Sequence, residues 1–155
     1  MSRIKNTFNR LKKRNEKALI PYIMAGDPDL AATKSIILAM EKAGCDIIEL
    51  GAPFTDPMAD GVAIQKAALR ALAAGGSLSV TLEIARRFRS VNQTTPLIVM
   101  GYANPIHRMG YAAFAQAAAE AGVDGVITVD LPPEEDAPLR TELAAHGLAV
   151  IRLAT

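Results

Sequence analysis

Several residue types that often carry chemistry are scarce in this chain of 155 residues. It contains no tryptophan, two histidines and one cysteine, Cys45. A single cysteine excludes an intrachain disulfide framework and fits a reducing compartment. The sequence has no run of about 20 apolar residues, and its basic N-terminus lacks the apolar segment of a secretory signal. We therefore expect a cytoplasmic protein in which Cys45 packs rather than reacts.

Charge of either sign is not in excess. The 17 lysines and arginines nearly balance the 16 aspartates and glutamates, which leaves a net charge of +1. This balance gives no electrostatic basis for binding nucleic acid or a membrane surface. The one basic cluster, residues 12–14, fits the solvated end of a helix.

The sequence also lacks the residues that two kinds of aldolase mechanism need, one dependent on a metal ion and one on a Schiff base. His107 and His146 lie far apart, one in an expected loop and one at an expected helix end, so they form no metal-ligand pair. A Schiff-base mechanism needs a lysine near the C-terminal end of a strand. Every lysine here lies in an expected helix or before the first strand. We expect no metal and no cofactor in this chain, which leaves acid/base chemistry by side chains.

What the sequence does contain is an alternation of short aliphatic runs and helical patterns. The aliphatic runs predict strands at 19–24, 46–50, 96–100, 125–129 and 149–153. Apolar spacing and capping residues predict helices at about 2–13, 30–43, 62–73, 79–89, 111–121 and 134–146. Residues 102–109 are predicted to form a loop.

Such alternation indicates βαβ units and a parallel sheet. Residues 43–48 and 121–126 repeat one pattern, in which a helix end is followed by Gly, a spacer, Asp and a buried strand. Right-handed crossovers leave two architectures, a doubly wound open sheet or a β/α barrel. The turn at 25–28, Ala-Gly-Asp-Pro, is not a dinucleotide-binding fingerprint, and this favours the barrel. The helix at 2–13 is expected to cover the bottom of that barrel.

The chain is organised around residues 48–61, Ile-Glu-Leu-Gly-Ala-Pro-Phe-Thr-Asp-Pro-Met-Ala-Asp-Gly. Glu49 lies near the C-terminal end of a predicted strand, and Asp60 closes the loop that follows. A carboxylate within an apolar strand is costly unless it is paired or used. Two acids at one junction are candidates for acid/base catalysis. The alternatives are a buried ion pair for Glu49 and a helix N-cap for Asp60.

Residues 48–61 resemble the signature of the tryptophan synthase α subunit at every position. Three further segments, 19–28, 100–105 and 129–132, resemble that family's first, third and fourth strand-loop junctions, in the same order. The resemblance implies a (β/α)8 TIM barrel of the α/β class, of which a complete example takes about 250 residues. We therefore expect 1–155 to form a single partial barrel domain, the first five β/α units. The family's phosphate-binding loops belong to the later units.

The resemblance also implies a reaction and its residues. The family cleaves indole-3-glycerol phosphate by a retro-aldol step to indole and glyceraldehyde 3-phosphate. Glu49 takes the place of the general acid/base and Asp60 that of the partner of the indole nitrogen. From their positions, Tyr102 and Phe54 are candidates for binding the substrate, although packed aromatic side chains would explain them equally well.

A partner is implied as well. The family pairs with a pyridoxal-phosphate-containing β subunit in an α2β2 heterotetramer and passes indole to it. Loops after the second to fourth strands form the contact surface in the family. The matching candidates for the interface or for loop structure are Asp56, Pro57, Asn104, Arg108, Asp130 and Pro132.

Two alternatives to this lyase remain at the sequence level. One is a non-catalytic module that docks on or modulates the β subunit. The other is a phosphate-handling barrel enzyme of different chemistry, against which the match over 48–61 weighs heavily. Open sheet edges in a partial barrel would be an aggregation liability.

Overall fold

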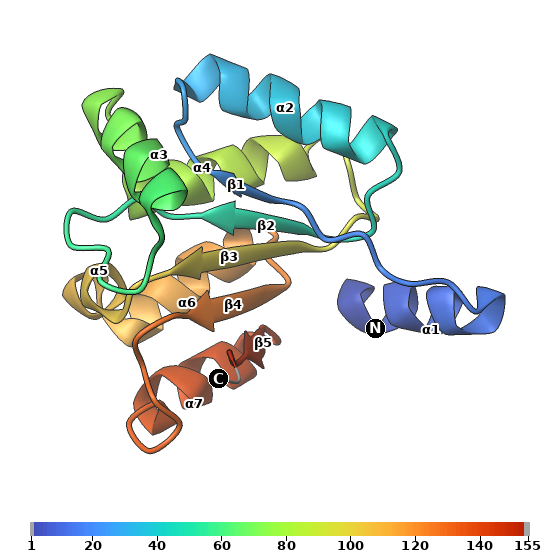
Figure 1. The fold of residues 1–155 in the computed structure, drawn as a ribbon. Helices are drawn as coiled ribbons and strands as arrows, with labels where there is room; N and C mark the ends of the chain where they lie inside the picture. The colour runs from blue at the N-terminus through green and yellow to red at the C-terminus, as the bar shows by residue number, and fades with distance from the viewer. Residues whose placement is uncertain (1, 154–155) are drawn as a thin grey trace.

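The computed structural model describes residues 2–153, and five parallel strands form its single sheet (Figure 1). The strands pair strictly in chain order, each with the next. A doubly wound sheet would reverse direction at a switch point, so the sequential order decides for the barrel. The strands are β1 (Tyr22–Met24), β2 (Ile48–Gly51), β3 (Leu97–Gly101), β4 (Gly125–Thr128) and β5 (Ala149–Ile151).

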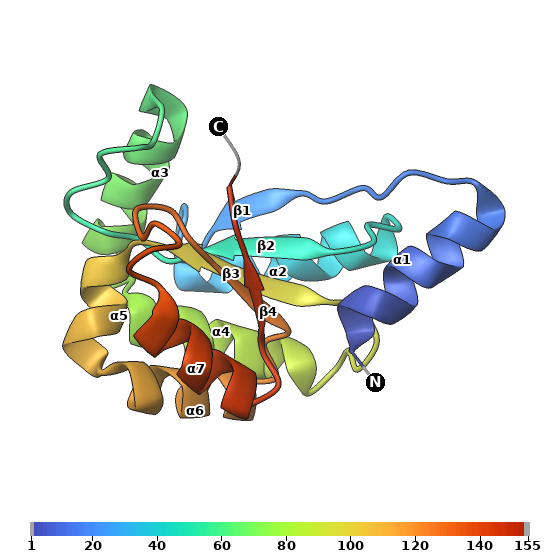
Figure 2. The same cartoon turned by 90° about the horizontal axis from the view of Figure 1, so that it is seen from below.

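Helices connect the strands and cover one face of the sheet. In Figure 2, α2, α4, α6 and α7 lie on the same side, and no helix of residues 2–153 covers the opposite face. The helices are α1 (Arg3–Arg14), α2 (Leu30–Lys42), α3 (Val62–Ala73), α4 (Leu78–Arg89), α5 (Ala103–Met109), α6 (Tyr111–Glu120) and α7 (Ala137–Ala145). This arrangement is the five-unit part of a TIM barrel that the sequence predicted.

The main core lies between the sheet and its covering helices. Alternate strand residues such as Leu50, Leu97 and Val99 point to that side and are almost fully buried. Phe114 of α6 is fully buried there, and the alanines around it let the helix approach the strands closely. A second apolar cluster, on the inner face, contains Ile47, Ile98 and Ile127, and Ile4 of α1 packs against it. Helix α1 therefore covers the N-terminal ends of the strands, as expected.

Several local signals in the sequence are confirmed. The side chains of Asp29 and Ser77 cap α2 and α4 by accepting backbone N–H bonds from Ala32 and Val80. Gly44 has φ +90° just after α2, a left-handed conformation that favours glycine at a helix end. The first strand begins only after Pro21, which has no N–H to donate; its carbonyl accepts from the Glu49 N–H.

Two predictions about local structure were wrong. Residues 103–109 form the short helix α5 rather than a loop, which also places His107 in a helix. Glu134 and Glu135 lie in a turn before α7, which begins at Ala137 with Pro138 in its first turn. Proline fits a first helical turn because no N–H is needed there.

The predicted helix faces are only partly buried. Leu11 and Ile37 are buried, but Phe8 is 48% exposed and Leu30 is 39% exposed. Cys45 is buried, and burial raises the pKa of its thiol. No single helix within residues 2–153 is long and apolar enough to cross a membrane; α3 and α4 pass that test only as a pair, bent by 89°.

Candidate active site

In Figure 1 the C-terminal ends of β1 to β4 point to one side of the molecule, where α3 and α5 also lie, and β5 pairs parallel with β4. Catalytic groups of β/α barrels are placed at this end of the strands. Glu49 lies in β2, in register with Tyr22 of β1 and Ile98 of β3. The loop after β2 carries Asp60 above the same end, immediately before α3.

Glu49 and Asp60 share an altered acidity. Burial raises the pKa of Glu49 above its ordinary value of 4.5, and no ion pair among residues 2–153 involves its carboxylate. Burial also raises the pKa of Asp60, and the nearby Tyr102 hydroxyl opposes that shift in part. Carboxyl groups with raised pKa values are suited to proton transfer near neutral pH.

The two structural alternatives for these acids are not found. Glu49 has no cationic partner in the described chain, so it is not half of a buried ion pair. Gly61, not Asp60, is the N-cap residue of α3, and no side chain caps that helix. Asp60 contributes only its backbone carbonyl, which accepts from the Gln65 side chain at 2.8 Å. Neither carboxylate is therefore neutralised by a cation within residues 2–153, and Asp60 has the Tyr102 hydroxyl as its side-chain hydrogen-bond partner.

Tyr102 and Phe54, the predicted substrate-binding pair, contact each other. Their ring centroids are 5.4 Å apart with an interplanar angle of 33°. Tyr102 is buried, and its hydroxyl accepts a hydrogen bond from the Ala59 N–H at 3.0 Å. The pair thus fixes the loop next to Asp60. Substrate binding by Tyr102 and Phe54 stays a prediction.

The other predicted residues fall into two groups. Asp130 accepts a hydrogen bond from the Ala103 N–H at 2.7 Å, so its carboxylate holds the first turn of α5. Asp56 accepts from the neighbouring Thr55 hydroxyl. Asn104, Arg108 and Pro132 are exposed and Pro57 is partly exposed, all on segments that follow the strand ends.

A cleft of about 560 Å³ opens at this end of the sheet. Asp60, Asp130 and Pro132 line it, together with Arg152, which the sequence did not single out. Arg152 is held by hydrogen bonds to the buried Asp136, one of them 3.1 Å long. No signal in the sequence joins these two residues, because their contact depends on how α7 returns to β5.

Tyr22 is a second residue that the sequence did not single out. It lies opposite Glu49 in the register, and the charges of Glu49, Asp60 and Tyr102 all act on its hydroxyl. The only feature of the sequence that points to Tyr22 as a site residue is its position near the end of the first predicted strand. That it lies against the second strand becomes visible only in the folded chain.

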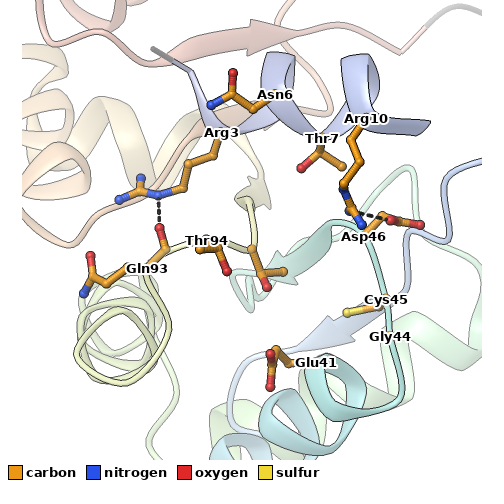
Figure 3. A pocket seen from close by; sticks show the side chains of 11 residues that line it. Arg3, Asn6, Thr7, Arg10, Glu41, Gly44, Cys45, Asp46, Gln93 and Thr94 are labelled. Carbon is orange, nitrogen blue, oxygen red and sulfur yellow. Dashed lines mark hydrogen bonds and ion pairs between the residues drawn. The ribbon is translucent and has the colours of Figure 1, made fainter. Parts of the chain in front are cut away.

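Another cavity, of about 460 Å³, lies at the opposite end of the strands, beneath α1. Figure 3 shows that α1 contributes one wall and that the loops before β2 and β3 contribute the other. Two arginines bridge it: Arg3 donates to the Gln93 carbonyl and Arg10 to the Asp46 carboxylate. This end is remote from Glu49 and Asp60. Within residues 2–153, no group of three His, Cys, Asp or Glu side chains could hold a metal ion.

The fold and the site define a β/α-barrel protein with two carboxyl groups at the C-terminal ends of its strands. A model of the family described as "Tryptophan synthase alpha chain" matches residues 8–155. The chain belongs to the tryptophan synthase alpha chain family.

Solved structures of this family are closely similar. Tryptophan synthase subunit alpha from Legionella pneumophila is 48% identical with a TM-score of 0.95, over 97% of this chain and 57% of that one. Tryptophan synthase from M. tuberculosis in its aminoacrylate-bound form is 36% identical with a TM-score of 0.94, over 99% and 62%. A tryptophan synthase α2β2 complex from Pyrococcus furiosus is 40% identical with a TM-score of 0.84, over 88% of this chain and 55% of that one. The chain therefore spans less than two thirds of the length of these relatives.

Proposed function

We propose that this chain acts in the cleavage of indole-3-glycerol phosphate to indole and glyceraldehyde 3-phosphate, a carbon-carbon lyase reaction of tryptophan biosynthesis. Glu49 is the general acid/base. It takes the proton of the glycerol hydroxyl that becomes a carbonyl, and it returns a proton to C3 of the indole ring. Asp60 accepts a hydrogen bond from the indole N–H and stabilises the positive charge that develops when C3 becomes tetrahedral.

One observation carries the proposal: two carboxyl groups with raised pKa values, neither of them in an ion pair within residues 2–153, lie on a strand end and on the loop above it. Strand β2 fixes Glu49 between two neighbours of the sheet, which suits a group that must transfer a proton at a defined position. The aromatic contact between Phe54 and Tyr102 holds the Asp60 loop against β3. Family membership gives this arrangement its substrate.

We also propose a partner, the tryptophan synthase β subunit, in an α2β2 assembly. The P. furiosus relative is described as such a complex. The exposed residues Asn104, Arg108 and Pro132, with Asp56 and Pro57, lie at the end of the barrel that opens to the site. In this assembly the pyridoxal phosphate belongs to the β subunit, and the present chain works without a cofactor.

Indole release from indole-3-glycerol phosphate tests the proposal. The chain is assayed alone and with a β subunit, beside Glu49→Gln, with circular dichroism to establish folding. We expect indole from the parent chain and at least about 100-fold less from the variant, since general acid/base catalysis contributes roughly 10²–10⁴-fold. Near-normal turnover by a folded Glu49→Gln protein would show that Glu49 does not have this role.

A second candidate function is a docking module that binds a β subunit without cleaving the substrate. It is supported by the exposed side chains of Asn104, Arg108 and Pro132 on the segments that follow the strand ends. The docking module would be favoured if the chain binds a β subunit but releases no indole, whether it is assayed alone or with that subunit. Indole release that depends on Glu49 would exclude it.

A further inference from the structure

The Tyr22 side chain crosses from β1 onto β2. Gly51 has no side chain, and a Cβ built there would lie 2.1 Å from the Tyr22 hydroxyl oxygen and 2.6 Å from Cζ. The phenol therefore occupies the space that any other residue at position 51 would fill. Glu49 and Gly51 are two residues apart in a strand, so they present the same face. The Tyr22 hydroxyl and the Glu49 carboxylate thus lie along one face of β2.

This hydroxyl has little to donate to within the chain. Among residues 2–153 its one hydrogen-bond contact is the Met24 sulfur, at 3.9 Å. A thioether is a weak acceptor, and the O–H of a partly buried tyrosine usually finds a better one. Tyr102 differs, because its hydroxyl has the Asp60 carboxylate as a side-chain hydrogen-bond partner, besides accepting from the Ala59 N–H. Tyr22 therefore has donor capacity to offer a bound ligand.

The hydroxyl also keeps its proton. Burial raises the pKa of Tyr22 far above its usual range, and the negative charges of Asp60 and Glu49 add to the shift. Where both carboxylates are acceptors, Tyr22 is thus a neutral donor. A ligand oxygen that donates to Glu49 still has a lone pair for Tyr22.

We propose that Tyr22 contacts the substrate and donates a hydrogen bond to the same oxygen that gives its proton to Glu49. The inference rests on the proposed function. In the cleavage, that hydroxyl proton passes to Glu49, the oxygen forms a carbonyl double bond, and the electrons of the broken carbon-carbon bond move to the indole ring, whose C3 takes up a proton. Tyr22 retains its own proton and stabilises the negative charge that builds on the oxygen.

The proposal predicts a preference for a ligand with a hydroxyl on the carbon attached to the indole ring. Two probes test this in the Glu49→Gln background, in which turnover should fall at least about 100-fold. They are indole-3-glycerol phosphate and 3-(indol-3-yl)propyl phosphate, which lacks the two hydroxyl groups between the indole ring and the phosphate. Dissociation constants are measured by ligand-observed NMR. The preference is the ratio of the dissociation constants of the deoxy ligand, 3-(indol-3-yl)propyl phosphate, and of indole-3-glycerol phosphate. Adding Tyr22→Phe should reduce this ratio by about 3- to 10-fold, as expected for the loss of one hydrogen bond between neutral groups. Affinity for the deoxy ligand should not change.

Tyr111→Phe in the same background is the matched control. Tyr111 lies on α6, where its ring contacts His107, and it should leave the preference intact. An unchanged preference in the Tyr22→Phe protein would overturn the inference and leave the proposed function standing. If the folded Glu49→Gln chain binds neither probe, and the parent releases no indole, both are wrong for this chain.

Discussion

At the scale of single residues, the site depends on the small size of Gly51, which has no side chain. Gly51 belongs to the motif around Glu49, and its φ is not in the left-handed region, so its conformation alone does not require glycine. Space does require it, because the Tyr22 phenol fills the position of a Cβ. The glycine of the motif is thus explained by close packing between β1 and β2.

Gly51→Ala should force the Tyr22 ring away from β2. Overpacking of this kind costs about 1–3 kcal/mol of unfolding free energy, measured by urea denaturation. Gly61→Ala is the control, because a Cβ at position 61 meets no atom within 4 Å. Gly61 is the N-cap of α3, where alanine is less favourable than glycine, so that variant should cost no more than about 1 kcal/mol. Equal stabilities for the two variants would contradict this packing.

The raised pKa of Glu49 has a consequence for stability as well as for catalysis. A carboxyl group whose folded-state pKa lies above its unfolded value binds its proton more tightly in the native state. Its contribution is fully present below the unfolded pKa, near 4.5, and is lost as pH rises through the raised pKa. The ionised acid therefore opposes folding at neutral pH, where the proposed catalysis needs it.

Glu49→Gln should accordingly gain stability relative to the parent chain as pH rises from about 4 to 8, while it loses turnover. Glu83→Gln is the matched control, because the pKa of Glu83 is shifted in the opposite direction. Hydrogen bonds from Arg87 and Arg86 lower its pKa, so its contribution is present above the ordinary value and lost as pH falls. Urea unfolding at several pH values measures both variants. A Glu49→Gln curve parallel to the parent's at every pH would refute the shift.

At the scale of secondary structure, the repeated sequence pattern has a repeated structural role. Asp46 and Asp124 each precede a strand, β2 and β4. Asp46 exchanges hydrogen bonds with the backbone of Leu19, and Asp124 does the same with Leu97. Each also accepts from an arginine of α1, Arg10 in one case and Arg3 in the other. The arginines are seven residues apart, on one helix face, and attach α1 to the bottom of the barrel.

The two aspartates differ in burial, and their removal should differ in cost. Asp124 also pairs with Arg89, and both of these side chains are less than a tenth exposed. Asp124→Asn leaves the Arg89 charge buried and uncompensated, which costs about 3–5 kcal/mol. The Arg10 side chain that pairs with Asp46 is 50% exposed, so Asp46→Asn should cost about 1 kcal/mol or less. Urea midpoints measure both; a larger loss for Asp46→Asn would disprove the argument.

The elements that the sequence mispredicted are those fixed by distant residues. Asn104 and Pro105 suggest a loop, yet Pro105 fits the first turn of α5 because no N–H is needed there. The first N–H of that helix is satisfied by Asp130, from the loop after the next strand. Local patterns cannot show such a contact. They do show the strands, because apolar runs bounded by glycine and acidic residues carry their own signal.

At the scale of the whole molecule, right-handed crossovers left two architectures open. The lack of a dinucleotide-binding fingerprint at residues 25–28 and the motif over residues 48–61 favoured the barrel, and the sequential strand order confirms it. The sequence was sufficient to place Glu49 and Asp60 at one strand-loop junction. It could not supply Tyr22 or Arg152, whose positions depend on register and on the return of α7 to β5. Partners in space that are distant in sequence are the part of a site that a pattern cannot reveal.

The placement of exposed groups at one end of the barrel gives the proposed docking surface a direct test. Arg108 lies on α5, exposed, beside the end that opens to Glu49 and Asp60. Reversing a rim charge changes association with a charged partner more than it changes folding. We expect Arg108→Glu to weaken binding to a β subunit by about 10-fold or less, in line with an exposed ion pair of up to about 1 kcal/mol.

The control for that surface is Arg14→Glu, at the end of α1 and thus at the opposite end of the barrel. Both arginines are exposed, so neither reversal should alter the urea midpoint by more than about 0.5 kcal/mol. Dissociation constants measured by calorimetry at low and moderate salt separate the two, because a contact between charges weakens as salt rises. A dissociation constant unchanged by Arg108→Glu would remove α5 from the interface. Equal weakening by both variants would point to net charge rather than to a surface at the mouth of the barrel.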